Sequence, residues 1–269
     1  MQDPTKLTSI DLKTEIHPTA IVNPWAKVGA GVKIGPYSII GEHVELGDGC
    51  VVGPRVLIEG RTTIGKNNEF FHGATIGTPA QDLKCEGDVA YVEIGDGNIF
   101  REFCTVNRAT DRGGKTKVGS DCFIMAYAHV AHNCVLADHV VMANSVHLAG
   151  HVTLDQYAII GGGTVVHQFV RVGQHAIIGG GCRVTQDIPP YVKAAGSPAR
   201  AFGVNTVGLE RRGFPAEKRA AIKRMYTVLY RRRLNVTQAL AHLRNGTFGD
   251  PERRILVDFL ESSQRGIAG

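Results

Sequence analysis

The strongest constraint on the fold is an apolar residue that recurs every six positions from Ile16 to Val184. Of the 29 positions on this register, 26 are apolar, and the exceptions are Asp82, Asp88 and Arg112. Neither an α-helix, with a period of about 3.6 residues, nor a plain strand, with a period of about 2, produces this spacing. Hexapeptide repeats are a signature of parallel β-helices. The register therefore predicts a mainly β protein with a coil of hexapeptide repeats over residues 16–188.

The position four residues after many of the apolar anchors is small, as at Ser38, Ala74 and Ala128. This position is also two residues before the next anchor, so both side chains point to the same face of a short extended segment. Each hexad then forms one short strand and one corner. Three hexads close a coil of 18 residues, and about nine coils fit the repeat region. The pattern alone leaves the hand of the coil open, because the usual preference is for right-handed crossovers.

Two interruptions and two terminal regions complete the predicted organisation. The register breaks near residues 78–93 and again near 108–117, where we expect loops, and loops on a rigid scaffold often carry function. Residues 1–15 are polar and lack the apolar core of a signal peptide. No run in the sequence approaches the roughly 18 apolar residues of a membrane span. We therefore expect a cytoplasmic protein without an integral membrane segment.

Residues 189–269 are expected to form a basic, helical C-terminal domain. They hold 15 Lys and Arg against 6 Asp and Glu, whereas the whole chain has a net charge of only +5. Apolar residues at helical spacing lie between Pro215 and Arg233, and Asp250-Pro251 has the chemistry of a helix start. Such a basic surface is either a solvated face or a means of steering an acidic partner. Nucleic acid is not expected, because stacking aromatics are not interleaved with the arginines.

The cysteines indicate core packing. Five of the six occupy the small inward position of the repeat, where free cysteine behaves as a small buried hydrophobe: Cys50, Cys104, Cys122, Cys134 and Cys182. Only Cys85 lies outside the register, in the first interruption. The spacing suggests neither a disulfide framework nor a CxxC metal site.

Histidines are concentrated where chemistry is expected. Seven of the eleven lie between His129 and His175. With 18 residues per coil, His129 lies beneath His147, and His132 lies beneath Gly150 and then Gln168, at the spacing of paired strands of about 4.8 Å. A single outward histidine is most often an ordinary surface residue. Several within three coils instead suggest a site.

The motifs of the chain resemble those of the UDP-N-acetylglucosamine 3-O-acyltransferases, which catalyse the first step of lipid A synthesis. The resemblance extends from about Ile16 to the last predicted helix. The hexapeptide register alone marks a broad acyltransferase superfamily, whereas Gln81-Asp82-Leu83-Lys84, Ala131-His132 and Arg211-Arg212-Gly213-Phe214 together are far more specific. The resemblance also rests on these segments: Asn133-Cys134, Leu148-Ala149-Gly150-His151, Val166-His167-Gln168-Phe169, Pro189-Pro190-Tyr191 and Phe202-Gly203-Val204-Asn205.

The resemblance implies a left-handed coil and transfer of an (R)-3-hydroxyacyl group from acyl carrier protein to the 3-hydroxyl of UDP-N-acetylglucosamine. A sugar hydroxyl needs a base to take its proton as it attacks a thioester, and imidazole is suited to that task. The resemblance assigns the base to His132. The oxyanion that forms needs preorganised N–H donors. The resemblance assigns this role to the backbone N–H of Gly150.

Further roles follow from the resemblance alone. Contacts to the sugar, the diphosphate or the acyl hydroxyl are implied for Asp82, Lys84, His129, His151, Gln168 and, more weakly, His167. Contacts to the uridine nucleotide are implied for Asn205, Arg211 and Arg212. Gly180 matches the position that limits acyl length. The resemblance also implies a homotrimer whose sites lie between subunits, and no metal or organic cofactor.

The chain departs from the family at three positions. Asn133 replaces an Asp that follows the catalytic histidine in some members, Asn107 replaces a frequent His, and Val207 replaces an acidic residue. An amide oxygen still accepts from the imidazole but stabilises imidazolium less than a carboxylate does. Asn133→Asp is therefore expected to keep or raise activity.

Three other functions remain open at the level of the sequence. A related branch of the family acylates a 3-amino sugar nucleotide and forms an amide. A γ-type carbonic anhydrase shares the coil and binds zinc through three histidines across a subunit interface, which the clustered histidines permit. A non-catalytic hexapeptide scaffold is the third.

Overall fold

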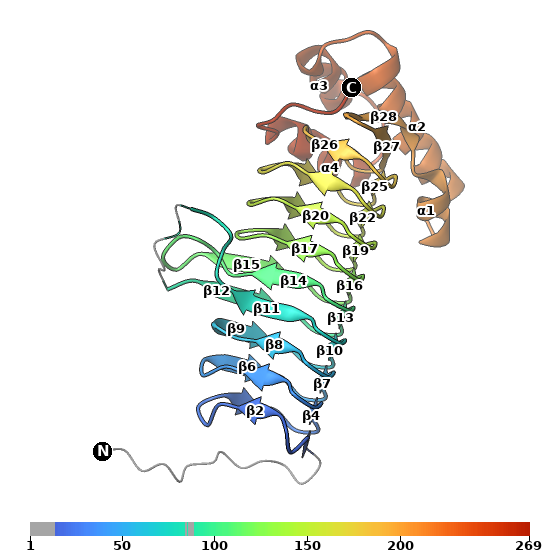
Figure 1. Cartoon of the computed structure of the whole chain (residues 1–269). Coiled ribbons are helices and arrows are strands. Elements are labelled where there is room, and N and C mark those ends of the chain that lie inside the picture. Colours follow the sequence, from blue (N-terminus) through green and yellow to red (C-terminus); the bar gives the residue numbers. More distant parts are fainter. Residues whose placement is uncertain (1–13, 84, 86–88) are drawn as a thin grey trace.

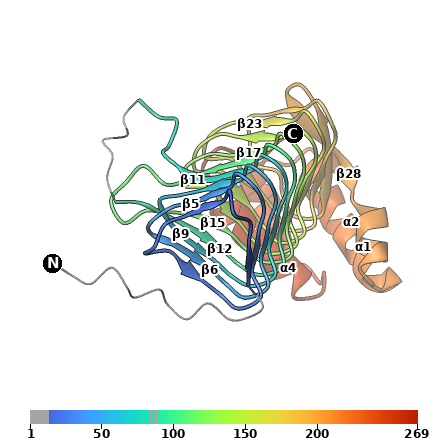
Figure 2. The same ribbon diagram turned by 60° about the horizontal axis from the view of Figure 1, so that its bottom comes forward.

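The computed structural model describes residues 14–83, 85 and 89–269, and it is a long coil with helices at one end (Figure 1). Three sheets form the walls of the coil, and they are parallel except for the final hairpin of residues 192–204, because each successive strand before that hairpin comes one coil later in the chain. Viewed closer to the coil axis, the stacked turns enclose a common interior (Figure 2). Lys84 lies outside the described residues.

Sheet A has eleven strands: β1 (Glu15–Ile16), β4 (Lys33–Ile34), β7 (Val51–Val52), β10 (Glu69–Phe70), β13 (Ile99–Phe100), β16 (Phe123–Ile124), β19 (Val141–Met142), β22 (Ile159–Ile160), β25 (Ile177–Ile178), β27 (Val192–Gly196) and β28 (Ala199–Val204). Sheet B has nine: β2 (Ile21–Val22), β5 (Ile39–Ile40), β8 (Leu57–Ile58), β11 (Thr75–Thr78), β14 (Thr105–Asn107), β17 (His129–Val130), β20 (His147–Leu148), β23 (Val165–Val166) and β26 (Arg183–Val184). Sheet C has eight: β3 (Lys27–Val28), β6 (Val44–Leu46), β9 (Arg61–Ile64), β12 (Tyr91–Ile94), β15 (Lys115–Val118), β18 (Val135–Leu136), β21 (Thr153–Leu154) and β24 (Arg171–Val172).

The interior of the coil is filled by the predicted anchors. Val130 and Ile160 are fully buried, and the small inward positions Ser38 and Ala128 are buried beside their neighbouring anchors. The five cysteines on the small position are buried and unbridged, as the register predicted. The anchors of the first coil are only partly buried, because no described coil lies below them. The core is therefore continuous along the axis, and among the described residues it is only partly covered at its N-terminal end.

The strand pairing confirms a coil of 18 residues wherever no loop intervenes. Val130 pairs with Leu148, and Leu148 pairs with Val166. The step rises to 30 residues between Phe70 and Phe100, because the first long connection adds 12 residues to that coil. Those two rings stack with centroids 4.9 Å apart, so the longer coil keeps the core in register.

The C-terminal region closes the other end of the coil. The hairpin of β27 and β28 continues sheet A and leads to four helices: α1 (Thr206–Arg211), α2 (Ala216–Arg231), α3 (Val236–Asn245) and α4 (Glu252–Glu261). The helices build a second small core around Leu209, Met225 and Leu243. The chain end then returns to the coil, where the N–H of Ala268 donates to the carbonyl of Asp187.

The start of the last helix differs by one residue from the sequence prediction. Pro251, not Asp250, immediately precedes α4. The carboxylate of Asp250 pairs with Arg253 at 3.2 Å and with Arg254 at 3.9 Å instead of capping the helix. No helix in the described part of the chain is long and apolar enough to cross a membrane.

Candidate active site

The candidate site lies at the edge where the coil turns from sheet B to sheet C, here called the B–C corner. The two long connections, from β11 to β12 and from β14 to β15, both leave the coil at this corner and project to the same side (Figures 1 and 2). The next coil turns here through Ala131-His132-Asn133-Cys134. The loops and His132 therefore meet although they come from three successive coils.

The imidazole of His132 has a polar neighbour at each of its two nitrogens. Its Nδ1 lies 3.0 Å from the side-chain oxygen of Asn133, and its Nε2 lies 3.8 Å from a carboxylate oxygen of Asp82. The side chain of His132 is 13% exposed, so it is largely shielded yet reaches the surface. Asn133 has φ of 59°, a left-handed conformation that Asn tolerates better than most residues, and the backbone N–H of Asn133 donates to the hydroxyl of the buried Thr116.

Gly150 occupies the same corner one coil later, as the 18-residue step predicted. A Cβ at this position would lie 2.5 Å from Nε2 of His132. The absence of a side chain thus makes room for the imidazole. The N–H of Gly150 makes no hydrogen bond within residues 14–83, 85 and 89–269, so it is available to an oxygen in the cleft.

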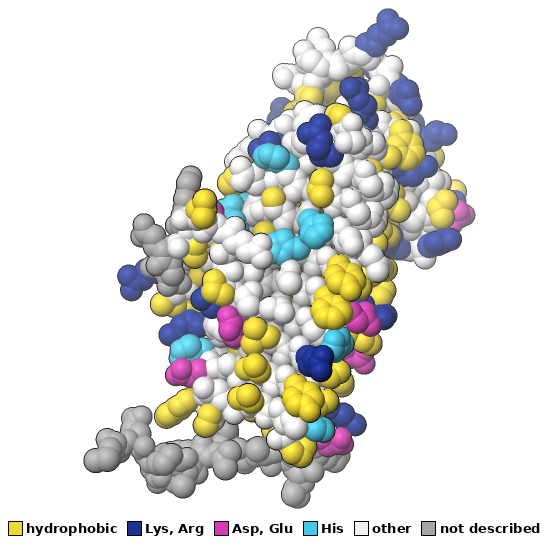
Figure 3. All heavy atoms as spheres, viewed as in Figure 1, with side chains coloured by type: hydrophobic (Ala, Val, Ile, Leu, Met, Phe, Trp, Pro, Cys, Tyr) yellow, Lys and Arg dark blue, Asp and Glu magenta, His cyan; other side chains and the backbone are white. Residues whose placement is uncertain are grey.

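A cleft of about 680 Å³ opens beside His132 on sheet B. Histidine side chains gather in the middle of this face (Figure 3). His129 pairs with His147 of the next coil, and their ring centroids are 6.4 Å apart. The cleft is lined by Gln81, Asp82, Leu83, His129, Ala131, His132, His147, Leu148, Ala149, Gly150, Val165, Val166 and Gln168.

Two histidines next to His132 are biased toward the neutral form. Burial lowers the pKa of His129, and the charges of His147 and His132 lower it further. Thr105 also holds His129, with its hydroxyl 2.7 Å from Nδ1. Burial likewise lowers the pKa of His151, with the charge of His132 adding to this effect and the negative charges of Asp111 and Asp82 opposing it. Neutral imidazoles can donate or accept hydrogen bonds to a polar substrate.

The other residues predicted near the sugar divide into two groups. Asp82, His129 and Gln168 line the cleft with His132. His151 lies beside His132 with its ring at 89° and a centroid distance of 5.3 Å, but it stacks on Phe169 outside the cleft lining. His167 is exposed and its Nδ1 lies 3.2 Å from the carbonyl of Gln168.

The residues predicted to bind the nucleotide lie in the C-terminal region, outside the lining of this cleft. Asn205 is buried: its amide caps α1 at the N–H of Gly208 and donates to the carbonyl of His175. Arg212 lies over the ring of Tyr157, with its guanidinium carbon 4.8 Å from the centroid, and Arg211 is exposed at the end of α1.

Gly180 lies at the opposite edge of sheet B, in the turn from β25 to β26. It is exposed, and a Cβ there would lie 3.1 Å from the carbonyl oxygen of Gly162, one coil earlier. The stacking of Gly180 on Gly162 that the 18-residue period predicted is therefore confirmed. Its role in chain length remains a prediction.

Three residues of this neighbourhood were given no role in the site from the sequence. His147 lines the cleft, and its predicted place one coil above His129 was the signal that could have assigned it. Thr110 and Asp111 hold the amide of Asn133 from the second loop. The hexapeptide register does not predict which residues of the coil this loop contacts, because the loop lies outside the repeat.

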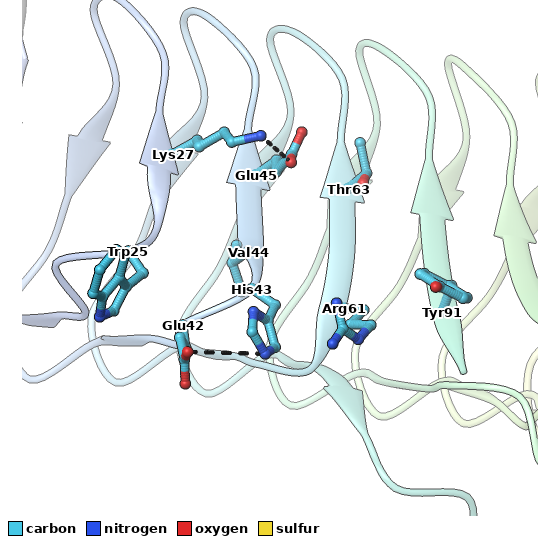
Figure 4. A pocket seen from close by; sticks show the side chains of 9 residues that line it. All are labelled: Trp25, Lys27, Glu42, His43, Val44, Glu45, Arg61, Thr63 and Tyr91. Carbon is cyan, nitrogen blue, oxygen red and sulfur yellow. Dashed lines mark hydrogen bonds and ion pairs between the residues drawn. The ribbon is translucent and has the colours of Figure 1, made fainter. Parts of the chain in front are cut away.

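A second hollow, of about 350 Å³, lies on sheet C near the N-terminal end and is less suited to proton transfer (Figure 4). Lys27 and Glu45 in it form an ion pair of 2.6 Å, and His43 lies 4.0 Å from Glu42. It contains a single imidazole, and Arg61 and Tyr91 extend from neighbouring strands at its far side. Among the described residues, no three His, Cys, Asp or Glu side chains converge as a metal site would require.

Comparisons with known proteins agree over nearly the whole chain. The model of bacterial transferase hexapeptides matches residues 13–47 and 115–150, and the model described as domain 2 of UDP N-acetylglucosamine O-acyltransferase matches residues 187–268. Two similar proteins are both named acyl-[acyl-carrier-protein]–UDP-N-acetylglucosamine O-acyltransferase. The one from Thiobacillus denitrificans is 48% identical over 94% of this chain and 98% of its own, and the one from Verminephrobacter eiseniae is 44% identical over 94% and 99%.

Solved structures give the same result. LpxA from Acinetobacter baumannii is 38% identical, with a TM-score of 0.91 over 94% of this chain and 99% of its own. LpxA from Bacteroides fragilis, described as a UDP-N-acetylglucosamine acyltransferase, is 39% identical with the same TM-score. Coils of opposite hand cannot superpose to this extent, so the chain has the hand of these structures, which is the left-handed one that the family resemblance implied. The chain is therefore a left-handed parallel β-helix of hexapeptide repeats with C-terminal helices.

Proposed function

The chain belongs to the UDP-N-acetylglucosamine O-acyltransferase family, and from this premise we propose that it transfers an (R)-3-hydroxyacyl group from acyl carrier protein to the 3-hydroxyl of UDP-N-acetylglucosamine. This transfer is the first step of lipid A synthesis. The observation that carries the proposal at the level of residues is the placement of His132, with Nδ1 held by Asn133 and the ring at the wall of a cleft large enough for a sugar.

His132 acts as the general base. Asn133 accepts a hydrogen bond from Nδ1–H, which leaves the lone pair on Nε2 to take the proton of the sugar hydroxyl. The hydroxyl oxygen bonds to the thioester carbon, and the carbonyl becomes an oxyanion that the N–H of Gly150 stabilises. When the carbon–sulfur bond breaks, the imidazolium returns its proton to the thiolate. The products are the sugar ester and the free thiol of the carrier protein, and no metal or organic cofactor takes part.

Asp82 stabilises the imidazolium that forms during this step. Its carboxylate lies 3.8 Å from Nε2, a distance at which opposite charges attract appreciably even beside solvent. The same carboxylate lines the cleft and can accept hydrogen bonds from sugar hydroxyls. We assign contacts to the sugar, the diphosphate or the acyl hydroxyl to Asp82, Lys84, His129, His151 and Gln168. His167 is a weaker candidate for the same contacts.

The active form is a homotrimer in the cytoplasm, with sites between adjacent subunits. Asn205, Arg211 and Arg212 lie outside the cleft of their own chain, and contacts from these residues to the nucleotide would come from a neighbouring subunit. Because the side chain of Asn205 is buried and bonded within its own chain, we expect Arg211 and Arg212 to contribute more to binding than Asn205.

The decisive experiment is incubation of the purified protein with (R)-3-hydroxyacyl carrier-protein thioesters and UDP-N-acetylglucosamine, with products identified by mass spectrometry. An ester at the 3-hydroxyl supports the proposal. Parallel incubation with the 3-amino sugar nucleotide separates ester from amide formation. Failure to acylate UDP-N-acetylglucosamine at any chain length, in a protein that elutes as a trimer, would overturn it.

A further inference from the structure

The side-chain amide of Asn133 connects the imidazole of His132 to the carboxylate of Asp111. The amide oxygen accepts from the N–H and the hydroxyl of Thr110, each at 3.1 Å, and the amide nitrogen donates to Asp111 at 2.6 Å. A backbone N–H can only donate and a carboxylate can only accept, so these two partners fix the orientation of the amide. The oxygen of Asn133 therefore faces Nδ1 of His132, and Nδ1 carries the proton.

The second loop has a turn that places Asp111 at this position. The N–H of Gly114 donates to the carbonyl of Asp111, and Gly113 between them has φ of 75°, in the left-handed region that favours glycine. A Cβ on Gly114 would lie 2.5 Å from a carboxylate oxygen of Asp111. The N–H of Gly113 also donates to the carbonyl of Val89 in the first loop. The two glycines thus allow the carboxylate to fold back onto the coil.

The charged groups around His132 lie on different sides of its ring. Asp82 faces Nε2, the nitrogen that takes the substrate proton, whereas Asp111 reaches the ring from the Nδ1 side through Asn133. His151 lies edge-on to the ring, and His129 lines the same cleft. Both of those neighbours are imidazoles, so the two carboxylates supply the negative charge.

We propose that Asp111 is a positioning residue for the base: it orients Asn133 and lends its charge through the amide to the imidazolium of His132. The inference rests on the proposed function of His132. The proton on Nδ1 remains there throughout the reaction, and neither Asn133 nor Asp111 is protonated. Asp111 thereby supplies from a loop the negative charge that an acidic residue at position 133 would supply directly.

Removal of the charge of Asp111 should weaken the base without displacing it. In Asp111→Asn the new amide oxygen can still accept from Asn133, so the orientation is kept and only the charge is lost. We expect kcat to fall about 3- to 10-fold, because the interaction is charge-assisted but exposed to solvent. KM should change little, and the acidic limb of the kcat profile should move to lower pH because imidazolium is less stabilised. Gly114→Ala, which displaces the carboxylate and so also weakens its bond to Asn133, should lower kcat at least as much.

The sharpest test exchanges the two side chains. Asn133→Asp alone places two carboxylates where a hydrogen bond of 2.6 Å now lies, so we expect repulsion and no gain in activity. The gain that the sequence predicts for Asn133→Asp should appear only when Asp111→Asn is added, since the amide introduced in the loop could then donate to the carboxylate introduced beside His132. Asp111→Asn would thus lower kcat in the natural protein and raise it in Asn133→Asp. An effect of equal size and sign in both backgrounds, or none in either, would overturn the proposal.

A control and a second readout separate this inference from the proposed function. Glu69→Gln removes one exposed negative charge from sheet A and should leave kcat and its pH profile unchanged. Nitrogen NMR of the His132 ring should show a proton on Nδ1 in the natural protein and in Asp111→Asn, and a partial shift toward the other tautomer in Asp111→Ala, where only Thr110 still orients the amide. This measurement needs no turnover, so it tests the orienting role even if the substrate differs. A ring unchanged in Asp111→Ala would count against it.

Discussion

His132 occupies the space that a side chain at position 150 would fill. Its ring lies against Gly150 of the next coil so closely that even the first carbon of a side chain there would collide with it. Gly150→Ala should therefore displace the imidazole while keeping the backbone N–H at that position. A misplacement of about 1 Å can reduce turnover roughly 100-fold, and we expect a loss of kcat of this order. A Gly150→Ala variant with normal kcat would show that the imidazole position is not critical.

His132→Ala should abolish turnover and leave the fold and nucleotide binding largely intact. A general base contributes about 10²- to 10⁴-fold, and it acts mainly in the transition state. The side chain of His132 is not part of the coil interior, so its removal should not destabilise the core. Kinetics, size-exclusion chromatography and UDP-N-acetylglucosamine titration would measure the three properties. Substantial turnover by this variant would remove His132 from the mechanism.

Ile160→Ala should cost about 2–5 kcal/mol of unfolding free energy, because Ile160 is fully buried and its truncation leaves a cavity. Ile39→Ala is the matched control: the side chain of Ile39 points outward on sheet B and is 42% exposed. Denaturant unfolding of both variants at one protein concentration would compare them. Equal losses would contradict the division into inward and outward positions.

His175 should make the protein less stable in acid. It lies in a ladder of stacked rings, with centroids 4.8 Å from Tyr157 and 5.9 Å from Tyr191, and its Nδ1 is buried without a hydrogen-bond partner among the described residues. Burial, aided by the charge of Arg212, lowers the pKa of His175 to about 4.

The pH dependence follows from proton binding. At pH values between the unfolded pKa of about 6.5 and the folded pKa of His175, this residue is protonated in the unfolded chain and neutral in the folded chain. The free energy of unfolding therefore falls as the pH falls through this range. His175→Phe, which keeps a ring between the two tyrosines, should remove up to about 1.4 kcal/mol per pH unit of that slope. Unfolding free energies at pH 7.5 and pH 5 would test this. Identical pH slopes for the two proteins would rule out the assignment to His175.

Gly180→Met should shift the acyl donor preference to shorter chains. The column of Gly162 and Gly180 presents backbone instead of side chains, so we expect the natural protein to prefer a relatively long 3-hydroxyacyl donor. The φ of Gly180 lies outside the left-handed region, so a side chain there needs only a small shift away from the carbonyl oxygen of Gly162, and overfilling the groove costs about 1–3 kcal/mol. Competition between long and short thioesters measures the preference. Val135→Met, on the exposed face of sheet C, is the control, and an unchanged preference in Gly180→Met would place the length limit elsewhere.

The sequence by itself determined the features that follow from its period. Six residues per side and 18 per coil fixed which side chains are buried, placed Cys134 and Ile160 inside, and placed His147 above His129. They also placed Gly150 above His132. This was possible because each coil repeats the hydrogen bonding of the last one, so sequence separation converts directly into position in space. The identity of the site came from its resemblance to a known family.

Only the tertiary structure decided what the aperiodic segments contact. Three contacts join residues separated by 22, 50 and 30 positions: that of Asp111 with Asn133, that of Asp82 with His132 and that of Asn205 with His175. No repeat links such residues, and the turn that orients Asp111 depends on two glycines and on a hydrogen bond to the other loop. The period therefore fixed the scaffold and the position of His132 on it, whereas folding of the loops against the scaffold fixed the charges around that histidine.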